Sequence, residues 1–471
     1  MNQNLATAAR HCAVGLLAAT TVLPLQAALA ADLIVTKFTD SLDGSCDSDC
    51  SLREAVQKAN RTPGASRIIL AAGTYRLSIP PQRDPDSDGE TLWLDDDDNL
   101  DGDLDIKGRL TIVGRGIDAT IIDAGGIDRI AEALPDAVAT LGKLTVAAGR
   151  NKRGGGGLWV NAGATLSLQS AKVINNTVSV GFDTAFGGGI LNEGTLNIDA
   201  SEISFNSTGA GDSNTSAGGG IYNLGSLVVR DARFFGNNAT NDDDRGDGGA
   251  IYNKGTADIR RASFQNNEVR IFGSGAAIFN TGFGVLRVEN STISGSTNGG
   301  EPASWTGAIE NGDRFGPSVT ARASLVNTTI ADNPIFGLVN RARVSITNSI
   351  IAGNGQKEDP VFGVPGVDAN CMNVGPDARF FQAGLLRGTD SGNCPSTLLV
   401  LNADSFVTLM YPLAANSSQL PTFALRPGSI AVDAAVGACP STDQRRVTRP
   451  RDGNGDGIAA CDLGAYERPK P

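Results

Sequence analysis

A short pattern of small, apolar and Asn residues recurs about every thirty residues through the middle of this chain, and no other feature constrains the fold as much. Each unit ends in Asn, and successive Asn positions lie 31, 31, 30, 27, 31 and 29 residues apart. Self-similarity at a period of this length is typical of solenoids. The repeated positions are Asn161, Asn192, Asn223, Asn253, Asn280, Asn311 and Asn340, and a second polar series about fifteen residues later comprises Asn176, Asn206, Asn237, Asn267, Ser296, Asn333 and Asn354.

The segments between these positions have strand composition. Leu227-Val228-Val229 and Val344-Ser345-Ile346 are apolar or β-branched, and Gly or Asn stands near their ends. A coil of about thirty residues cannot bury its apolar row alone, so neighbouring coils must stack. Stacked Asn side chains can hydrogen-bond as a ladder at the strand spacing of about 4.8 Å, and Asn tolerates the left-handed backbone of a tight corner. We therefore predict an all-β, single-stranded parallel β-helix. A Gly/Asn-rich linker is the alternative. Leucine-rich repeats have a Leu pattern that is missing here and lack runs of three glycines such as residues 187–189, and the content of Gly and β-branched residues excludes helical repeats.

The first thirty residues have the features of a secretory signal peptide. Arg10 gives a positive start, residues 13–29 carry no charge, and residues 28–30 form a small-residue cleavage site. Removing this segment changes the formal net charge from -12 to -13, because Arg10 is its only charged residue. An acidic chain of this kind is unsuited to nucleic acid or anionic membranes as partners. No later segment has the length and apolarity of a transmembrane helix. We expect an exported protein that is extracellular or associated with the cell surface.

The histidine and cysteine content narrows the chemistry further. The only histidine, His11, lies in the predicted signal peptide, which excludes Ser-His-Asp and Cys-His catalysis and imidazole metal ligands in the exported chain. An even number of cysteines in an exported protein predicts disulfides. Zinc is the alternative, although the spacings do not match a metal finger. The cysteines form three sequence-local pairs: Cys46 and Cys50, Cys371 and Cys394, and Cys439 and Cys461.

Both ends of a solenoid need caps, because an exposed parallel edge pairs with other chains. Ser51 and Glu54 have the spacing of a capping box, which predicts a short helix over residues 52–59. We interpret this helix as a lid over the first coil; a catalytic ion pair of Arg53 and Glu54 is the alternative. The chain then divides into a signal peptide (1–30), an N-terminal cap (31–75), first coils with an acidic insertion (76–145), the repeat core (146–360), C-terminal coils and loops (361–430) and a C-terminal module (431–471).

Several motifs resemble those of bacterial surface proteins. Residues 50–55, Cys-Ser-Leu-Arg-Glu-Ala, resemble the motif that names the CSLREA domain, and residues 433–435, 449–450 and 461–467 resemble the choice-of-anchor Q module. The repeats at 248–251 and 264–267 resemble the GGA[ILV] and FxxN repeats of polymorphic outer-membrane adhesins. This resemblance covers nearly the whole exported chain. It implies a right-handed, pectin-lyase-like β-helix displayed outside the cell, and no defined activity. Unlike those families, the chain shows neither a membrane barrel nor a sorting tail, so we expect release or attachment through a partner.

Three acidic stretches match the D-x-[DN]-x-[DN]-G core of a calcium-binding loop. Alternating oxygen ligands closed by a Gly turn suit a hard cation, although none of the three has the Glu that completes an EF-hand. We expect calcium to stabilise the end regions of the chain through at least one of them; solvated acidic loops are the alternative. The candidate ligands are Asp84, Asp86, Asp88, Asp97, Asn99, Asp101, Asp452, Asn454 and Asp456.

The segments between each second polar position and the next glycine cluster vary in sequence and are acidic. In a β-helix they project from one edge, one above another, which predicts a carboxylate-lined groove; acidic loops that keep the solenoid soluble are the alternative. The carboxylates are those of Asp183, Asp212, Asp242, Asp243, Asp244 and Asp247.

Two classes of function fit this scaffold. The first is a non-enzymatic surface or secreted protein that uses the β-helix for adhesion or for binding a glycan or a host or matrix surface. The second is a polysaccharide lyase, which needs an Arg or Lys base beside calcium-bound carboxylates, or a glycoside hydrolase, which needs paired carboxylates. The repeat contains no compact Asp-Asp or Asn-x-Asp string, and Arg260 and Arg261 stand where surface ion pairs are common. We therefore favour the binding protein.

Overall fold

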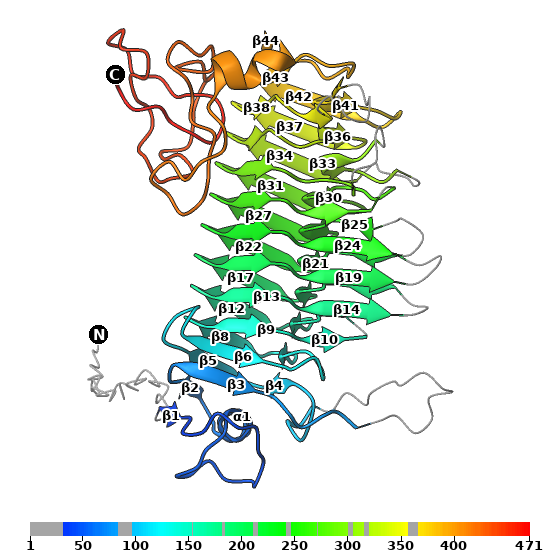
Figure 1. Cartoon of the computed structure of the whole chain (residues 1–471), viewed down its shortest axis with the longest axis vertical. Coiled ribbons are helices and arrows are strands. Elements are labelled where there is room, and N and C mark those ends of the chain that lie inside the picture. Colours follow the sequence, from blue (N-terminus) through cyan, green and yellow to red (C-terminus); the bar gives the residue numbers. More distant parts are fainter. Residues whose placement is uncertain are drawn as a thin grey trace, which may run out of the picture.

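The computed structural model describes residues 32–82, 97–152, 154–180, 184–210, 215–241, 246–270, 272–299, 305–314, 320–356 and 366–471. Over these residues the chain forms a right-handed parallel β-helix whose coils stack along the long axis of the molecule (Figure 1). A full coil contributes one strand to each of three parallel sheets, which hold 10, 12 and 12 strands within the described ranges. The predicted fold class is confirmed.

The three sheets are numbered here in the order in which a coil passes through them. Sheet 1 contains β4 (Leu104–Ile106), β7 (Ala131–Ala133), β11 (Leu158–Val160), β16 (Ile190–Asn192), β21 (Ile221–Asn223), β26 (Ile251–Asn253), β30 (Ile278–Asn280), β33 (Gly307–Asn311), β36 (Phe336–Asn340) and β41 (Cys371–Asn373). Sheet 2 contains β1 (Leu33–Ile34), β2 (Ala65–Ile69), β5 (Arg109–Val113), β8 (Val138–Gly142), β12 (Thr165–Gln169), β17 (Thr195–Asp199), β22 (Ser226–Arg230), β27 (Thr256–Arg260), β31 (Val285–Glu289), β34 (Arg322–Val326), β37 (Arg343–Thr347) and β42 (Arg379–Ala383). Sheet 3 contains β3 (Gly73–Arg76), β6 (Thr120–Asp123), β9 (Thr145–Ala147), β13 (Lys172–Ile174), β18 (Glu202–Ser204), β23 (Arg233–Phe235), β28 (Ser263–Gln265), β32 (Thr292–Ser294), β35 (Thr329–Ile330), β38 (Ile350–Ile351), β43 (Leu386–Gly388) and β44 (Leu398–Val400).

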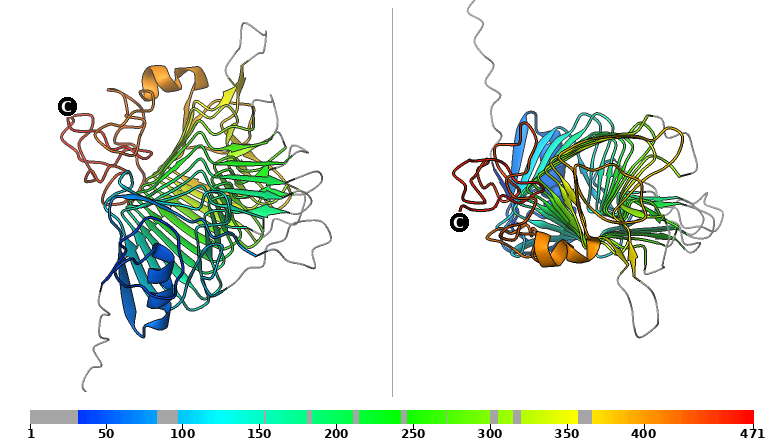
Figure 2. Two further views of the ribbon diagram at one scale, coloured as in Figure 1. Left: turned by 60° about the horizontal axis from the view of Figure 1, so that its bottom comes forward. Right: turned by 90° about the horizontal axis from the view of Figure 1, so that it is seen from above.

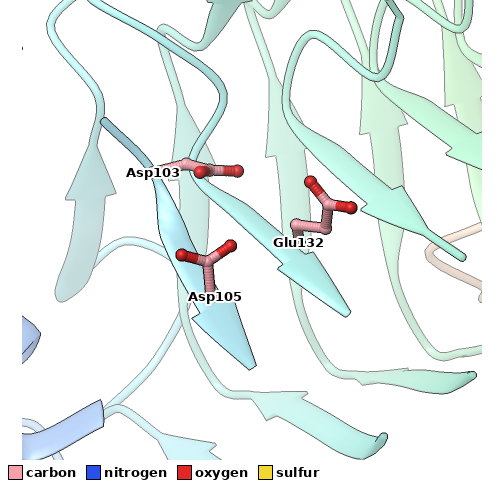
Figure 3. Close-up of side chains that lie close together, drawn as sticks. All are labelled: Asp103, Asp105 and Glu132. Carbon is pink, nitrogen blue, oxygen red and sulfur yellow. The ribbon is translucent and has the colours of Figure 1, made fainter. Parts of the chain in front are cut away.

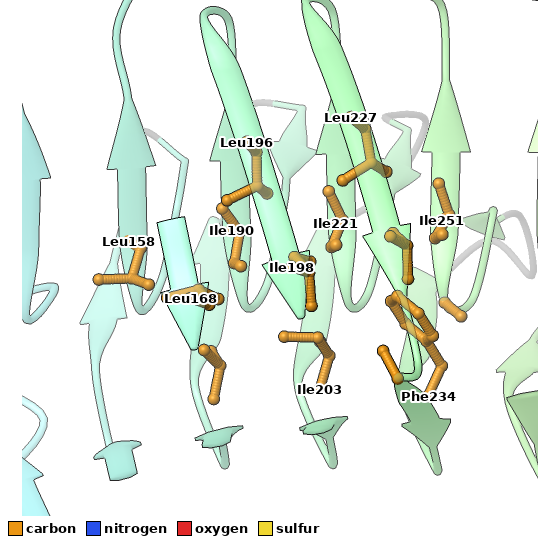
Figure 4. Packing of buried hydrophobic residues seen from close by; sticks show 14 of the residues in the cluster. Leu158, Leu168, Ile190, Leu196, Ile198, Ile203, Ile221, Leu227, Phe234 and Ile251 are labelled. Atoms are coloured by element: carbon orange, nitrogen blue, oxygen red, sulfur yellow. The ribbon is translucent and has the colours of Figure 1, made fainter. Parts of the chain in front are cut away.

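Apolar side chains at matching positions of successive coils fill the interior (Figure 4). Leu166, Leu196 and Leu227 are direct partners in the register of sheet 2, and all three are buried. In sheet 3 the rings of Phe234 and Phe264 lie 4.6 Å apart at 6° to each other. Full burial of a side chain of this size contributes roughly 1.5–3 kcal/mol. The core is therefore a set of rows along the axis, which explains why the apolar positions recur in phase.

Two ladders of buried Asn side chains run beside these rows. In the first, each Nδ2 from Asn192 to Asn340 donates to the Oδ1 of the Asn one coil on, over distances of 2.6–2.8 Å, and Asn373 receives the last bond. The second links Asn176 to Asn267 at 2.9–3.0 Å. The predicted ladders are confirmed, although Asn161 bonds Glu132 instead of its neighbour Asn192. The expected left-handed backbone falls one position before the second ladder, for example at Asn175 (φ 55°) and Asn266 (φ 52°).

The N-terminal end is covered by helix α1 (Leu52–Arg61), seen in Figure 2 beside the first coils. Ser51 accepts from the backbone of Glu54, whose carboxylate accepts in return from the backbone N–H of Ser51. Leu52, Ala55, Val56 and Ala59 bury the apolar face of the helix. The capping box and the lid are confirmed, and the helix runs two residues beyond the predicted end. All three predicted disulfides are formed: Cys46–Cys50, Cys371–Cys394 and Cys439–Cys461.

Residues 401–471, here called the returning segment, leave the last coil and run back along the outside of sheet 3 (Figure 1). The segment includes a 3₁₀ turn (Asn402–Asp404) and a π-helical turn (Ser405–Leu409). Phe423, Leu425 and Leu463 bury an apolar contact against Ile350 and Leu386 of sheet 3. A short antiparallel pair, β39 (Gly355–Gln356) and β40 (Val367–Asp368), lies in the last coils. No helix in the described ranges is both long and apolar enough to cross a membrane.

Candidate functional site

Five consecutive coils each carry an extra outgoing strand at one edge of the solenoid, and the three middle coils also carry an incoming strand. We call this projection the fin (Figure 1). Its outgoing strands align in register, with Thr177 opposite Ser207 and Ser207 opposite Asn238. Its incoming strands align in the same way, from Ala185 through Ser216 to Gly246. The fin consists of β10 (Arg150–Asn151), β14 (Thr177–Val180), β19 (Ser207–Ala210), β24 (Asn238–Asn241), β29 (Glu268–Val269), β15 (Ala185–Phe186), β20 (Ser216–Ala217) and β25 (Gly246–Asp247).

A second apolar cluster holds the base of the fin against the outer face of sheet 1. Tyr222 and Tyr252 occupy matching outward positions in the register of the sheet and stack with centroids 4.8 Å apart. Phe186, at the end of β15, packs its ring 4.5 Å from that of Tyr222, and Phe279 lies 5.3 Å from Tyr252. Aromatic pairs at such distances add about 0.5–1.5 kcal/mol beyond burial. The loops of the fin therefore stand on a packed base.

A glycine joins each incoming strand to the next strand of sheet 1. Gly187, Gly218 and Gly248 have φ between 62° and 68°, in the left-handed region. A Cβ at these positions would approach a backbone carbonyl oxygen to within 2.4–2.6 Å, closer than any real contact. The turn therefore requires glycine for two reasons, backbone conformation and space. This requirement accounts for the first glycine of the repeated Gly-Gly signature.

Most of the predicted groove carboxylates belong to the loops between the outgoing and incoming strands of the fin. Asp183, Asp212, Asp242, Asp243 and Asp244 lie outside the described residues, but the strands on both sides of each loop are described and aligned. For Asp247 the predicted place in the groove is wrong. It is only 2% exposed, and its Oδ1 accepts from the backbone N–H of Ser274 at 2.8 Å. Asp247 therefore supports the base of the fin, because incoming strand β25 already includes it.

A separate group of three carboxylates lies at the N-terminal end of sheet 1 (Figure 3). Asp103, Asp105 and Glu132 each have an oxygen within 4.8 Å of the others, and among the described residues they form the one group close enough to share a metal ion. Asp105 and Glu132 are register partners in β4 and β7, whose alternate residues Leu104 and Ala131 belong to the core. The two carboxylates therefore point to the outside of the sheet.

This group is buried and already contains a cation. Arg129, 1% exposed, contacts Glu132 and lies with its Nε 3.4 Å from Asp103 Oδ2. Asn161 donates to the other oxygen of Glu132. Burial raises the pKa of Asp103 well above its usual range, despite the attraction of Arg129. The arrangement suits a buried charge network, and a metal ion would have to share Glu132 with these two donors.

The second predicted calcium loop, residues 97–102, lies beside this group. Asn99 accepts from and donates to the backbone of Asp105, at 3.0 and 2.7 Å. The carbonyl of Asp101 accepts from Arg53 at 2.9 Å. Asp97 and Asp101 are not members of the metal-compatible group. Sequence reasoning missed Asp103, Asp105 and Glu132, although the alternation of acids continues past Gly102 into a strand.

The other two predicted calcium loops have different outcomes. Asp84, Asp86 and Asp88 lie outside the described residues. In the third loop, Asp452 accepts from the backbone N–H groups of Gly455 and Gly457 at 2.7 and 3.2 Å and pairs with Lys470 at 3.1 Å. Asn454 and Asp456 are exposed and bond each other at 3.1 Å. These contacts close the loop through its own backbone.

Other carboxyl groups with raised pKa values face arginines. Burial raises the pKa of Glu310 to about 7; the group is fully buried beside Arg341 and accepts from Gly275 N–H at 3.2 Å. In the returning segment burial raises the pKa of Glu467 to about 7, and the Nε of Arg449 lies 3.2 Å from it. Arg53 pairs with Asp40 at 2.9 Å and not with Glu54. The alternative of a catalytic pair of Arg53 and Glu54 is therefore wrong.

No family model and no curated protein matches the sequence. The crystal structure of pectate lyase Pel9A is similar in fold, with a TM-score of 0.46 and 13% sequence identity, over 94% of this chain and 98% of that one. A likeness at this level says nothing of activity.

Proposed function

We propose that this chain is an exported, non-enzymatic β-helix protein that binds an extended extracellular ligand, a glycan in the first place. The binding site would be the edge of the fin at which the segments 181–184, 211–215 and 242–245 connect its strands, here called the loop edge. The observation that carries the proposal is the register of the fin, in which three segments of acidic sequence connect aligned outgoing strands to aligned incoming strands. Loops on a rigid scaffold are the usual carriers of binding residues. A ligand with repeating units is matched by a surface that repeats once per coil.

The surroundings of the buried acids support a binding role over catalysis. Glu310, Glu467 and Asp103 have raised pKa values, as catalytic acids often do. Each of them, however, is at most 2% exposed and faces an arginine of the scaffold. Burial within the scaffold therefore explains the raised pKa values of these three acids without a catalytic role. We further propose, on the motifs at residues 50–55 and 433–467, membership of the CSLREA and choice-of-anchor Q surface proteins.

Calcium is part of the same proposal. Asp84, Asp86 and Asp88 offer the alternating oxygen ligands that calcium prefers. Bound calcium would stabilise the N-terminal end without any catalytic role.

The test is a glycan and matrix-protein binding screen with the exported chain and two triple variants of equal charge change. Asp242→Asn/Asp243→Asn/Asp244→Asn alters the loop edge, whereas Asp32→Asn/Asp118→Asn/Asp136→Asn alters exposed acids elsewhere. We expect the first variant to lose binding of the ligand that the screen identifies and the second to retain it. Equal binding by both variants would refute the proposal that the ligand binds at the loop edge. Release of unsaturated uronates or new reducing ends from pectin or alginate would favour the lyase or hydrolase instead.

A further inference from the structure

A cleft of about 550 Å³ lies between the returning segment and the outside of sheet 3. Its floor is formed by coils around β13, β18 and β23, and its opposite wall by residues 418–420 and 444–446. The fin projects from the other side of the solenoid in the views of Figures 1 and 2. We propose that this cleft binds an uncharged linear oligosaccharide, as a site independent of the loop edge.

The cleft results from a change of residue size along one corner of the solenoid. The residue after each strand of sheet 2 from β8 to β42 has a left-handed backbone, for example φ 48° at Asn290, 46° at Asn327 and 45° at Ala200. In the later coils this residue reaches out and binds the returning segment: Asn290 donates to Thr442 O at 2.8 Å and Asn327 to Asp462 O at 3.1 Å. In the coil of β17 the same position is Ala200, which lines the cleft. The segment is held away from the solenoid by longer side chains and therefore leaves a gap over Ala200.

Asp231 fixes the height of the gap. It is the corner residue between Ala200 and Arg261, and its two oxygens accept from Arg261 at 2.8 Å each. The same oxygens accept from Arg446 of the returning segment at 3.2 and 2.9 Å. One coil beyond Arg261, Thr292 bonds Gln444 at 2.7 Å in a buried contact. Both walls are thereby held before any ligand arrives, and a preformed cleft avoids the entropy cost of ordering its walls on binding.

The charges of the lining indicate an uncharged ligand. Glu202 lies 3.1 Å from Lys172 and 3.8 Å from Arg233, and Arg445 lies 2.7 Å from Asp443. Together with the pairing of Asp231 just described, each lining charge has an opposite partner within the protein. A charged ligand would have to break one of these pairs.

A neutral, hydroxyl-rich chain keeps these pairs and still finds hydrogen-bonding groups, because carboxylates, guanidinium groups and the amide of Gln419 line the cleft. Leu420 and Ile117 offer apolar contact to the C–H faces of sugar rings. The volume falls in the range of about 300–1,000 Å³ that is usual for ligand sites, and sites between parts of a structure are common.

The test measures binding of cellohexaose, xylohexaose and mannohexaose to the exported chain by calorimetry. Gln419→Trp places a large side chain at the cleft from an exposed position, and Ala415→Trp adds the same side chain at an exposed position outside the lining. We expect one of the three sugars to bind, with at least a tenfold loss of affinity in Gln419→Trp and no change in Ala415→Trp. Matching thermal unfolding curves of the two variants show that both are folded.

The outcomes separate this site from the loop edge. Binding that survives Gln419→Trp, or absence of binding by all three sugars, overturns the cleft proposal. The variant Asp242→Asn/Asp243→Asn/Asp244→Asn should retain hexaose binding, because its substitutions lie in the fin. If that variant loses hexaose binding while Gln419→Trp retains it, the loop edge is the glycan site and the cleft is not.

Discussion

Arg53 holds the N-terminal cap to the first coil, and its replacement by Met tests how that end is stabilised. The side chain is fully buried and its guanidinium donates to Asp40 at 2.9 and 3.1 Å. It also donates to the carbonyl oxygens of three consecutive residues, Asp101, Gly102 and Asp103, at 2.7–2.9 Å. Met has a similar length and no charge. The substitution therefore leaves three carbonyls without their donor and one buried carboxylate without its partner.

The magnitude follows from these contacts. Removing one partner of a buried ion pair costs about 3–5 kcal/mol, because the remaining charge stays buried. Arg67→Met is the control: Arg67 is 53% exposed on its side chain and lies 3.6 Å from Asp32, so its loss should cost under about 1 kcal/mol. Adding Asp40→Asn to Arg53→Met should recover part of the loss. The amide oxygen still accepts from Ser78 N–H and Ile79 N–H, and the uncompensated charge is gone.

The assay is amide hydrogen exchange over residues 99–106, because a solenoid opens from its ends and a single global transition would hide a local effect. Arg53→Met should lower the opening free energy of this stretch by about 3–5 kcal/mol, while residues 220–260 in the middle keep their protection. Equal exchange in Arg53→Met and Arg67→Met would refute the reasoning. So would an equal loss of protection along the whole solenoid, because it would mean that the cap and the first coil do not open separately.

Three further predictions concern the ladders, the buried acids and calcium. Asn223→Ala leaves the side chains of Asn192 and Asn253 each without one ladder partner, so denaturant unfolding should show a loss of about 2–4 kcal/mol, against a smaller loss for the part-exposed Asn161→Ala. The folded-state pKa of Glu310 is raised from 4.5 to about 7, so the folded state binds the proton more tightly than the unfolded state does. The free energy of unfolding should therefore fall as pH rises from about 4.5 to 7, and Glu310→Gln should flatten that part of the pH profile. An unchanged slope in Glu310→Gln would contradict the raised pKa of Glu310. Millimolar calcium should raise the melting temperature relative to chelator, and Asp84→Asn/Asp86→Asn/Asp88→Asn should abolish the difference. Identical melting curves of the unsubstituted chain in calcium and in chelator would remove calcium from the proposal.

The repeat predicted the body of the fold because the rows of buried residues are built from contacts between adjacent coils. A buried position such as Leu196 contacts its equivalents one coil before and after, so periodicity in the sequence reports directly on contacts. The Asn ladder is predictable for the same reason. The prediction placed the left-handed corner at the ladder Asn, which is one residue too late in the sequence. The residue before it, Asn175 or Asn266, makes the turn.

The contacts that position the candidate sites were out of reach for the opposite reason. Arg446 meets Asp231 across 215 residues, and Arg53 meets Asp101 across 48 residues, with no repeat to announce either pairing. The spacing of the acids in the sequence also did not identify the three carboxylates that lie close together. In residues 97–105 the alternation reflects first a loop and then strand β4, and only the strand places Asp105 beside Glu132 of the next coil. A motif of alternating acids is thus compatible with a loop that wraps a cation and with a strand that lines a sheet. Register with the neighbouring coil, not spacing within the motif, decides which carboxylates meet.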